Sequence, residues 1–415
     1  MNEIVSLDML QASGIGALAL LAGMAMTRKI KWLQRFCIPS PVSGGLLFSL
    51  ITLLLYKVAH IEVTFDGTLK DVFMLAFFTS VGFQSNIKVL RQGGKTLVLM
   101  LVLLVVIIAI QNLMPLGITR LMGVNPLIGM AAGSISMAGG HGTAGGFSAV
   151  LEGMGLNGAA TVSMAAATFG LISGSVIGGP VAERLIRKHL KSEHLEPKDF
   201  TPDPAMTGIE SDESLPAGRE KHLSSHEEEF QQYASATYSL LIVMALGTLT
   251  SRLLQTTGIT FPTYFGALIT AAIIRNVIEH TRYSRKLAME KIVSVGNICL
   301  SLFLGMAMIS LKLWELQSLA MPLLTILVAQ VAMIALLTYF VAFRLLGSDY
   351  DAAVLVAGIC GFGLGATPNA MANMSAVCYK YHYSVKPFLI VPIIGAMFVD
   401  LINTGIITFF LHWIG

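Results

Sequence analysis

The sequence predicts an all-α, polytopic membrane protein. Of its 415 residues, 54% are hydrophobic and only 12% are charged, whereas soluble domains carry about 25% charged residues. Uncharged runs such as 96–110 and 322–341 suit a bilayer core of about 30 Å, which about 20 helical residues span. Two glycine-rich stretches, 133–143 and 358–369, interrupt this apolar pattern. The charge content and the length of the apolar runs exclude a soluble enzyme with buried helices.

Ten membrane spans are expected, five on each side of a central polar stretch at 188–230. This stretch holds four prolines among many charges and is predicted to be a solvated loop. The four cysteines are scattered without CxxC spacing, so neither a disulfide framework nor a zinc site is predicted, and no cofactor is expected. The expected spans are 7–26, 41–58, 71–90, 96–116 and 158–185 in the first half, and 233–254, 262–279, 292–313, 321–345 and 387–413 in the second.

An internal repeat relates the first half, 1–187, to the second half, 231–415. Three landmarks keep the same order at a nearly constant offset, which is the signature of repeated architecture. Pro41 and Gly45 correspond to Pro262 and Gly266 at an offset of 221, Lys88 corresponds to Lys312 at 224, and Gly133 corresponds to Gly358 at 225.

The basic residues predict the orientation. With the N-terminus outside, 22 of the 27 Lys and Arg residues fall in inside loops, as the positive-inside rule requires. Both termini are then outside and the 188–230 loop is cytoplasmic. Five spans per half is an odd number, so the second half enters from the opposite face and the repeats are inverted. The glycine-rich segments, about 126–151 and 350–377, become re-entrant helical hairpins that dip in from opposite sides.

The two hairpins are predicted to form the substrate site. Backbone at membrane depth leaves the helix only where protein or a water-filled cavity covers it, and paired broken segments point to a transporter's binding site. The N-terminal end of a half-helix attracts a carboxylate, while free carbonyls and hydroxyls are oxygen ligands that suit Na⁺. The candidate substrate-binding residues are Ser136, Gly139, Gly140, His141, Gly142, Thr143, Gly361, Gly363, Gly365, Thr367 and Asn369.

Polar residues within the spans are candidate Na⁺ ligands. Asp400 lies well inside the last span with Asn403 nearby, and an intramembrane carboxylate is a functional hypothesis by default. Asn297 and Ser301 are four residues apart on one helical face. Hydrogen bonds between helices are the alternative role for all four. His141 could shuttle protons, bind substrate or serve as a structural histidine.

The paired glycine motifs, Gly139-Gly140-His141-Gly142-Thr143 and Gly361-Phe362-Gly363-Leu364-Gly365-Ala366-Thr367-Pro368, resemble those of the bacterial sodium/glutamate symporter family. The segments 38–45 and 300–304 are also similar to that family, and the resemblance covers nearly the whole chain. It implies Na⁺-coupled uptake of L-glutamate across the inner membrane by a homodimer. It also implies two re-entrant hairpins at the substrate site and an elevator-like movement of a transport domain.

Three other function classes are alternatives to symport. A proton-coupled carboxylate carrier would use His141 and Asp400. An ion channel would conduct without stoichiometric coupling. An intramembrane enzyme is not predicted, because no nucleophile stands beside His141 in a recognisable motif. The expected partners are therefore glutamate, Na⁺ and the lipid bilayer, with no nucleic acid.

Overall fold

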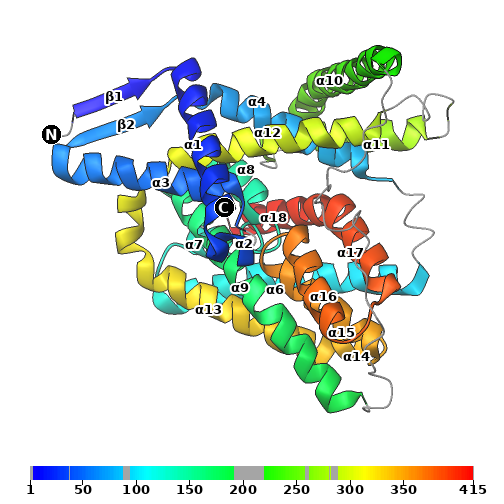
Figure 1. The fold of residues 1–415 in the computed structure, drawn as a ribbon. Helices are drawn as coiled ribbons and strands as arrows, with labels where there is room; N and C mark the ends of the chain where they lie inside the picture. The colour runs from blue at the N-terminus through cyan, green and yellow to red at the C-terminus, as the bar shows by residue number, and fades with distance from the viewer. Residues whose placement is uncertain are drawn as a thin grey trace.

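The computed structural model describes residues 3–36, 38–86, 94–190, 219–257, 261–279, 281 and 288–414. Helices dominate the fold, and one small sheet lies near the N-terminus (Figure 1). In chain order the elements are β1 (Glu3–Leu7), α1 (Met9–Lys29), α2 (Lys31–Arg35), α3 (Ser40–Leu54), η1 (Leu55–Ala59), β2 (Ile61–Phe65), α4 (Thr68–Gln84), α6 (Gly94–Met122), α7 (Pro126–Ala131), α8 (Gly140–Gly153), α9 (Ala159–His189), α10 (Arg219–Gln255), α11 (Thr263–Ile278), α12 (Met289–Ile309), η5 (Leu313–Ser318), α13 (Ala320–Leu337), η6 (Thr338–Ala342), α14 (Phe343–Leu345), α15 (Tyr350–Leu364), α16 (Thr367–Lys380), α17 (Val385–Met397) and α18 (Val399–Ile414).

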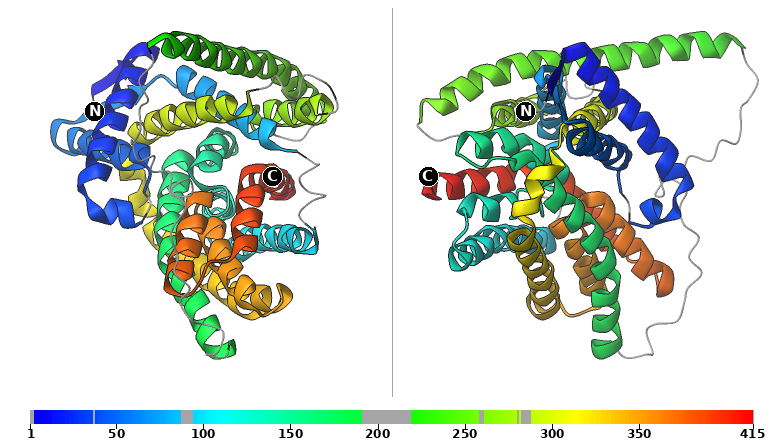
Figure 2. Two further views of the ribbon diagram at one scale, coloured as in Figure 1. Left: turned by 45° about the vertical axis from the view of Figure 1, so that its right-hand side comes forward. Right: turned by 90° about the vertical axis from the view of Figure 1, so that its left-hand side faces the viewer.

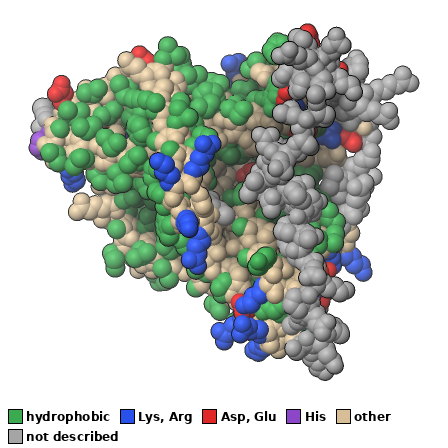
Figure 3. Space-filling model, viewed as in Figure 1, with side chains coloured by type: hydrophobic (Ala, Val, Ile, Leu, Met, Phe, Trp, Pro, Cys, Tyr) green, Lys and Arg blue, Asp and Glu red, His purple; other side chains and the backbone are tan. Residues whose placement is uncertain are grey.

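The length and polarity of these helices identify a polytopic membrane protein, as predicted. Among the described residues, seven helices are long and apolar enough to cross a membrane, and the bent pair α17–α18 makes an eighth. Large apolar side chains face outward, Leu21 at 62% and Leu241 at 55% exposure, and such side chains cover much of the face seen in Figure 3. The other two expected spans are α4 and α11, which have only 17 and 16 residues.

The helices pack into two bundles, and each bundle draws on both halves of the chain. In the first bundle α1, α3, α4, α10, α11 and α12 pack on one another; in the second, α6 to α9, α13 and α15 to α18 do so. The first bundle lies in the upper part of Figure 1 and the second in the lower part, and Figure 2 keeps this separation in two further views. Contacts between the bundles are sparse, chiefly α8 with α12, α17 with α4 and α18 with α11.

Glycines of α8 face aromatic rings of the first bundle. A β-carbon on Gly146 would lie 2.3 Å from a ring carbon of Tyr264, and one on Gly145 would lie 2.4 Å from a ring carbon of Phe303. Because neither glycine has a side chain, α8 approaches these rings closely. Phe147 of α8 also contacts the Tyr264 ring edge-on, with ring centroids 6.2 Å apart.

The structure corrects three expectations about secondary structure. The fold is not purely helical, because β1 and β2 pair in parallel with Glu3 opposite Ile61; these short segments are rich in β-branched residues. Residues 219–230, predicted as loop, belong to α10, since Glu and Lys are good helix formers despite their charge. The last span is not one rod but is bent by 47° between α17 and α18.

The bend in the last span could not be predicted from the sequence, because the residues before and after it are apolar. Pro392 inside α17 cannot donate a hydrogen bond to the carbonyl four residues earlier, and the break follows at Phe398. Asp400 consequently lies in the first turn of α18 rather than in mid-helix. Two further predictions concern residues outside the described ranges: the Lys88 landmark and most of the central polar stretch, 191–218.

Candidate functional site

The first glycine-rich segment is a broken helix. Its first arm, α7, begins with Pro126 after Asn125, whose side chain accepts a hydrogen bond from the Leu127 N–H. A turn at 132–139 follows, and α8 begins at Gly140. Gly140 has φ +58°, a left-handed conformation that glycine adopts without a steric penalty. The first N–H groups of α8 have no hydrogen-bond partner within the helix, so they are available to other acceptors. Residues 132–142 are here called the first tip.

The second segment is broken in the same way. The first arm, α15, ends at Leu364, and α16 begins at Thr367 with Pro368 in its first turn. Proline suits that position because its missing N–H has no partner there in any case. The two arms pack closely: a β-carbon on Gly361 would lie 2.4 Å from the Ala370 nitrogen. The residues between the arms and at the start of α16, 365–368, are here called the second tip.

The two tips meet. A β-carbon on Gly140 would lie 2.6 Å from the carbonyl oxygen of Gly365. A cavity of about 380 Å³ opens beside this contact, a volume within the usual range for small-ligand sites. Its wall takes residues from both tips and from both bundles: Pro39, Pro41, Phe77, Val81, Gln84, Ala138, Gly139, Gly140, His141, Gly142, Leu171, Asn297, Leu300, Ser301, Leu304, Phe362, Gly365, Ala366, Thr367, Pro368, Gly395, Ala396, Val399 and Asp400.

Two titratable side chains lie on the cavity wall. His141, in the first turn of α8, is 6% exposed, and its Nε2 lies 3.0 Å from Oγ1 of Thr168 on α9. Asp400, in the first turn of α18, accepts a hydrogen bond from Oγ1 of Thr143 over 3.3 Å. Among the described residues that line the cavity, none is Lys or Arg. The positive electrostatic potential at this wall must therefore come from the N-terminal ends of helices, as it does at other anion-binding sites.

The structure brings most of the predicted site residues together. Nine of them line the cavity: Gly139, Gly140, His141, Gly142, Gly365, Thr367, Asn297, Ser301 and Asp400. Thr143 lies just behind the wall, where it is buried and donates to Asp400. The sequence placed these residues on four separate segments, and the two hairpins and the bend before α18 assemble them.

The other five predicted residues lie away from the wall. Ser136 donates to the carbonyls of Ala131 and Ser163, and Gly363 packs beside Ile334. Gly361 lies where α15 packs closely against α16. Asn369 and Asn403 donate to the carbonyls of Leu171 and Ser134, over 2.8 and 3.0 Å, and the Oδ1 atom of each is buried and has no hydrogen-bond partner among the described residues.

Sequence reasoning missed a set of buried amides that hold the hairpins. Gln111 on α6 donates to the carbonyl of Gly363 over 2.6 Å, and Gln330 on α13 donates to those of Gln111 and Ala132. Asn112 accepts from the Ser134 N–H and donates to its hydroxyl. Polar residues inside apolar spans were the available signal. Gln84 on α4 also lies on the cavity wall.

Comparison with known proteins identifies the family. A profile described as Sodium/glutamate symporter matches residues 5–383. The chain is 41% identical over 407 residues to the sodium/glutamate symporter of Escherichia coli (strain K12), covering 98% of each chain. The chain belongs to the sodium/glutamate symporter family. The family's relative from Haemophilus influenzae is 37% identical over 394 residues, covering 95% of this chain and 94% of that one.

Membership of the symporter family confirms the resemblance carried by the paired glycine motifs. Among solved structures, a sodium proton antiporter from Methanocaldococcus jannaschii matches with 16% identity and a TM-score of 0.42, covering 98% of both chains. That similarity is too weak to bear on the fold of the symporter family. The family match and the membrane helices together identify a membrane transport protein.

Proposed function

We propose that this protein carries L-glutamate into the cell by Na⁺-coupled symport. The observation that carries the proposal is the match between the cavity and the charges of glutamate. Glutamate has two carboxylates, and the cavity wall offers two helix N-termini, at Gly140 and Thr367; it also holds the carboxylate of Asp400, which suits the coupling Na⁺. Each N-terminus attracts an anion. The curated relatives are named sodium/glutamate symporters.

The proposed substrate contacts come mainly from the tips. The N–H groups of Gly140, His141 and Gly142 bind one carboxylate, and the start of α16 at Thr367 binds the other. Glycine at 140 and 365 lets the ligand approach the backbone directly. Gln84 and Asn297, which the first bundle contributes to the wall, supply amide groups that can bond a carboxylate or an ammonium group. Their role is to keep the substrate in contact with both bundles.

The proposed Na⁺ ligands surround Asp400. Asp400, Asn297 and Ser301 all line the same cavity, and Thr143 connects Asp400 to α8. Asn403 contributes a buried amide oxygen that has no hydrogen-bond partner in the part of the chain that the structure describes. Hard oxygen donors of this kind suit a small cation. A bound Na⁺ offsets the Asp400 charge and fixes α18 against the first tip, which prepares both tips for glutamate.

An elevator-like movement fits the two bundles. The second bundle holds both tips, and its α8 faces the first bundle through Gly145 and Gly146, which carry no side chain. We propose that this bundle moves across the first to carry the site between the two sides of the inner membrane, with inverted repeats as its framework. The proposed assembly is a homodimer, with both termini outside and the central polar stretch in the cytoplasm.

Reconstituted vesicles test the coupling. Purified protein is placed in liposomes, and uptake of labelled glutamate is measured with and without an inward Na⁺ gradient at clamped pH. Uptake against a glutamate gradient is expected only with the Na⁺ gradient. Uptake that ignores Na⁺ would rule out the proposed coupling.

One alternative is favoured by a specific observation. His141 and Asp400, both titratable, face the same cavity, as a proton-coupled carboxylate carrier would require. In the vesicles described above, a pH gradient without Na⁺ distinguishes the two functions. Uptake driven by the pH gradient alone would favour the proton-coupled carrier.

A further inference from the structure

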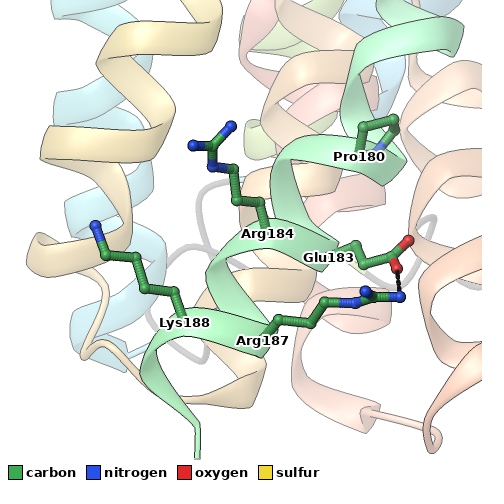
Figure 4. A pocket seen from close by; sticks show the side chains of 5 residues that line it. All are labelled: Pro180, Glu183, Arg184, Arg187 and Lys188. Carbon is green, nitrogen blue, oxygen red and sulfur yellow. Dashed lines mark ion pairs between the residues drawn. The ribbon is translucent and has the colours of Figure 1, made fainter.

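A second hollow lies far along α9 from the tips, at the end of the helix. Its volume is about 460 Å³, and it is lined by Pro180, Glu183, Arg184, Arg187 and Lys188 (Figure 4). Three of its five lining residues are basic, and all three side chains are exposed. None of these residues belongs to the substrate cavity. The hollow is therefore a separate surface feature, called here the α9 groove.

The charges of the α9 groove divide into a satisfied pair and a free pair. Glu183 forms ion pairs with Arg187 and with Lys380 of α16, the latter at 2.6 Å. Arg184 and Lys188 form no ion pair with any residue that the structure describes. Figure 4 shows these two side chains on one side of α9 and the Glu183–Arg187 pair on the other. The free side of α9 thus presents two cations, four residues apart, on one helical face.

The free side of α9 adjoins an apolar surface. Both α13 and η6 pack against α9, and the Lys188 ammonium nitrogen lies 6.0 Å from the centre of the Tyr339 ring. Next to Tyr339 along the chain, Leu336, Phe340 and Leu345 have exposures of 57%, 50% and 51%. These side chains belong to an apolar helix of a membrane protein, and lipid chains cover such surfaces. Arg184 and Lys188 therefore lie at the end of a lipid-facing apolar strip that includes Leu336, Phe340 and Leu345.

We propose that the α9 groove binds an anionic diacyl phospholipid. The headgroup phosphate lies between Arg184 and Lys188, where a guanidinium can bond two phosphate oxygens at once and an ammonium can add a third contact. The acyl chains run along the exposed strip of α13, η6 and α14. Basic pockets between membrane helices are known to bind anionic headgroups in this way.

The apolar strip favours a lipid over a soluble phosphate. A free phosphate or a glycerol phosphate would gain only the two charge contacts, which water and salt weaken. A diacyl lipid adds the burial of its chains against Leu336 and Phe340. It also arrives from the bilayer, beside the last turns of α9 that carry Arg184 and Lys188.

Native mass spectrometry of the full-length protein in neutral detergent tests the site. Phosphatidylglycerol, phosphatidylcholine and sn-glycerol 3-phosphate are titrated as separate probes. Wild-type protein should bind one tight phosphatidylglycerol per chain, with phosphatidylcholine and glycerol phosphate much weaker. The double variant Arg184→Gln, Lys188→Gln should weaken phosphatidylglycerol binding about thirtyfold, since each basic contact near a membrane surface contributes about a fivefold effect.

A matched control separates a built site from diffuse attraction. Lys31 and Arg35 of α2 are also exposed, and Lys31→Gln, Arg35→Gln removes the same charge elsewhere. This control should change phosphatidylglycerol binding less than twofold. Equal losses in both double variants would overturn the proposal, as would equal wild-type affinity for phosphatidylcholine or glycerol phosphate. The wild-type comparison of probes decides the question even if a variant fails to fold.

Discussion

Gly140 of the first tip faces Gly365 of the second so closely that a β-carbon on Gly140 would lie 2.6 Å from the Gly365 carbonyl oxygen. The chain separates these residues widely, yet the fold brings them into contact at the wall of one cavity. Gly140 must remain without a side chain for this contact to exist. The tip-to-tip contact therefore sets the shape of the proposed glutamate site.

Replacing Gly140 with alanine tests that contact. Its φ of +58° disfavours any side chain by roughly 1–2 kcal/mol, and the added carbon meets the Gly365 oxygen. Gly140→Ala should reduce glutamate uptake at least tenfold, measured in vesicles at equal protein incorporation. Gly153→Ala, at the end of the same helix with open space around its α-carbon, should transport normally. Normal uptake by Gly140→Ala would show that the contact is dispensable.

Removing the hydroxyl of Thr143 tests the link to Asp400. A hydrogen bond to a charged group contributes roughly 1.5–3 kcal/mol, so Thr143→Val should raise the Na⁺ concentration for half-maximal uptake by about tenfold or more. Thr143→Ser should restore the wild-type value. The control is Ser148→Ala, because this α8 hydroxyl donates only to Gly145. An unchanged Na⁺ requirement in Thr143→Val would remove Thr143 from the proposed cation site.

A bulky residue at Gly146 tests movement between the bundles. A β-carbon there would lie 2.3 Å from the Tyr264 ring, so Gly146→Val should interlock α8 with α11. Uptake should fall at least tenfold while equilibrium glutamate binding stays within a few-fold of wild type. Gly153→Val provides the control on the same helix. Parallel losses of binding and uptake would point to damage at the site rather than to blocked movement.

The ion pair between Lys312 and Glu62 tests the connection between β2 and the turn that joins α12 to η5. Its atoms are 2.7 Å apart, and the Glu62 carboxylate raises the pKa of Lys312 above its ordinary value of 10.5. The pair is partly exposed, so Lys312→Met should cost at most about 1 kcal/mol of stability. Because the folded state raises this pKa, the contribution is full near neutral pH and declines as the pH rises through the raised value.

Thermal unfolding of wild type and Lys312→Met across that pH range measures the difference. The gap between the two melting temperatures should be constant near neutral pH and should close in strongly alkaline buffer. Lys57→Met serves as a control for removing an exposed positive charge. A gap that persisted unchanged in alkali would assign the effect to packing rather than to charge.

The sequence was sufficient for the parts of the site that depend on local chemistry. Glycine, proline and hydroxyl residues at 139–143 and 361–369 predicted two helix breaks, and both occur. The sequence could not predict the bend before Asp400, because the residues on both sides of the bend are apolar and hydropathy does not distinguish a bent span from a straight one. Nor could it place Asn369 and Asn403, whose amides turn toward backbone carbonyls that only the tertiary fold positions.

The central claim is that glutamate binds where the two tips meet, together with Na⁺. Isothermal titration of glutamate into purified protein, with Na⁺ or with choline in its place, tests it most directly on wild type, Gly140→Ala and Gly153→Ala. We predict that Na⁺ tightens binding at least tenfold in wild type and Gly153→Ala, and that Gly140→Ala loses this binding. Sodium-independent affinity, or wild-type binding by Gly140→Ala, would contradict the claim.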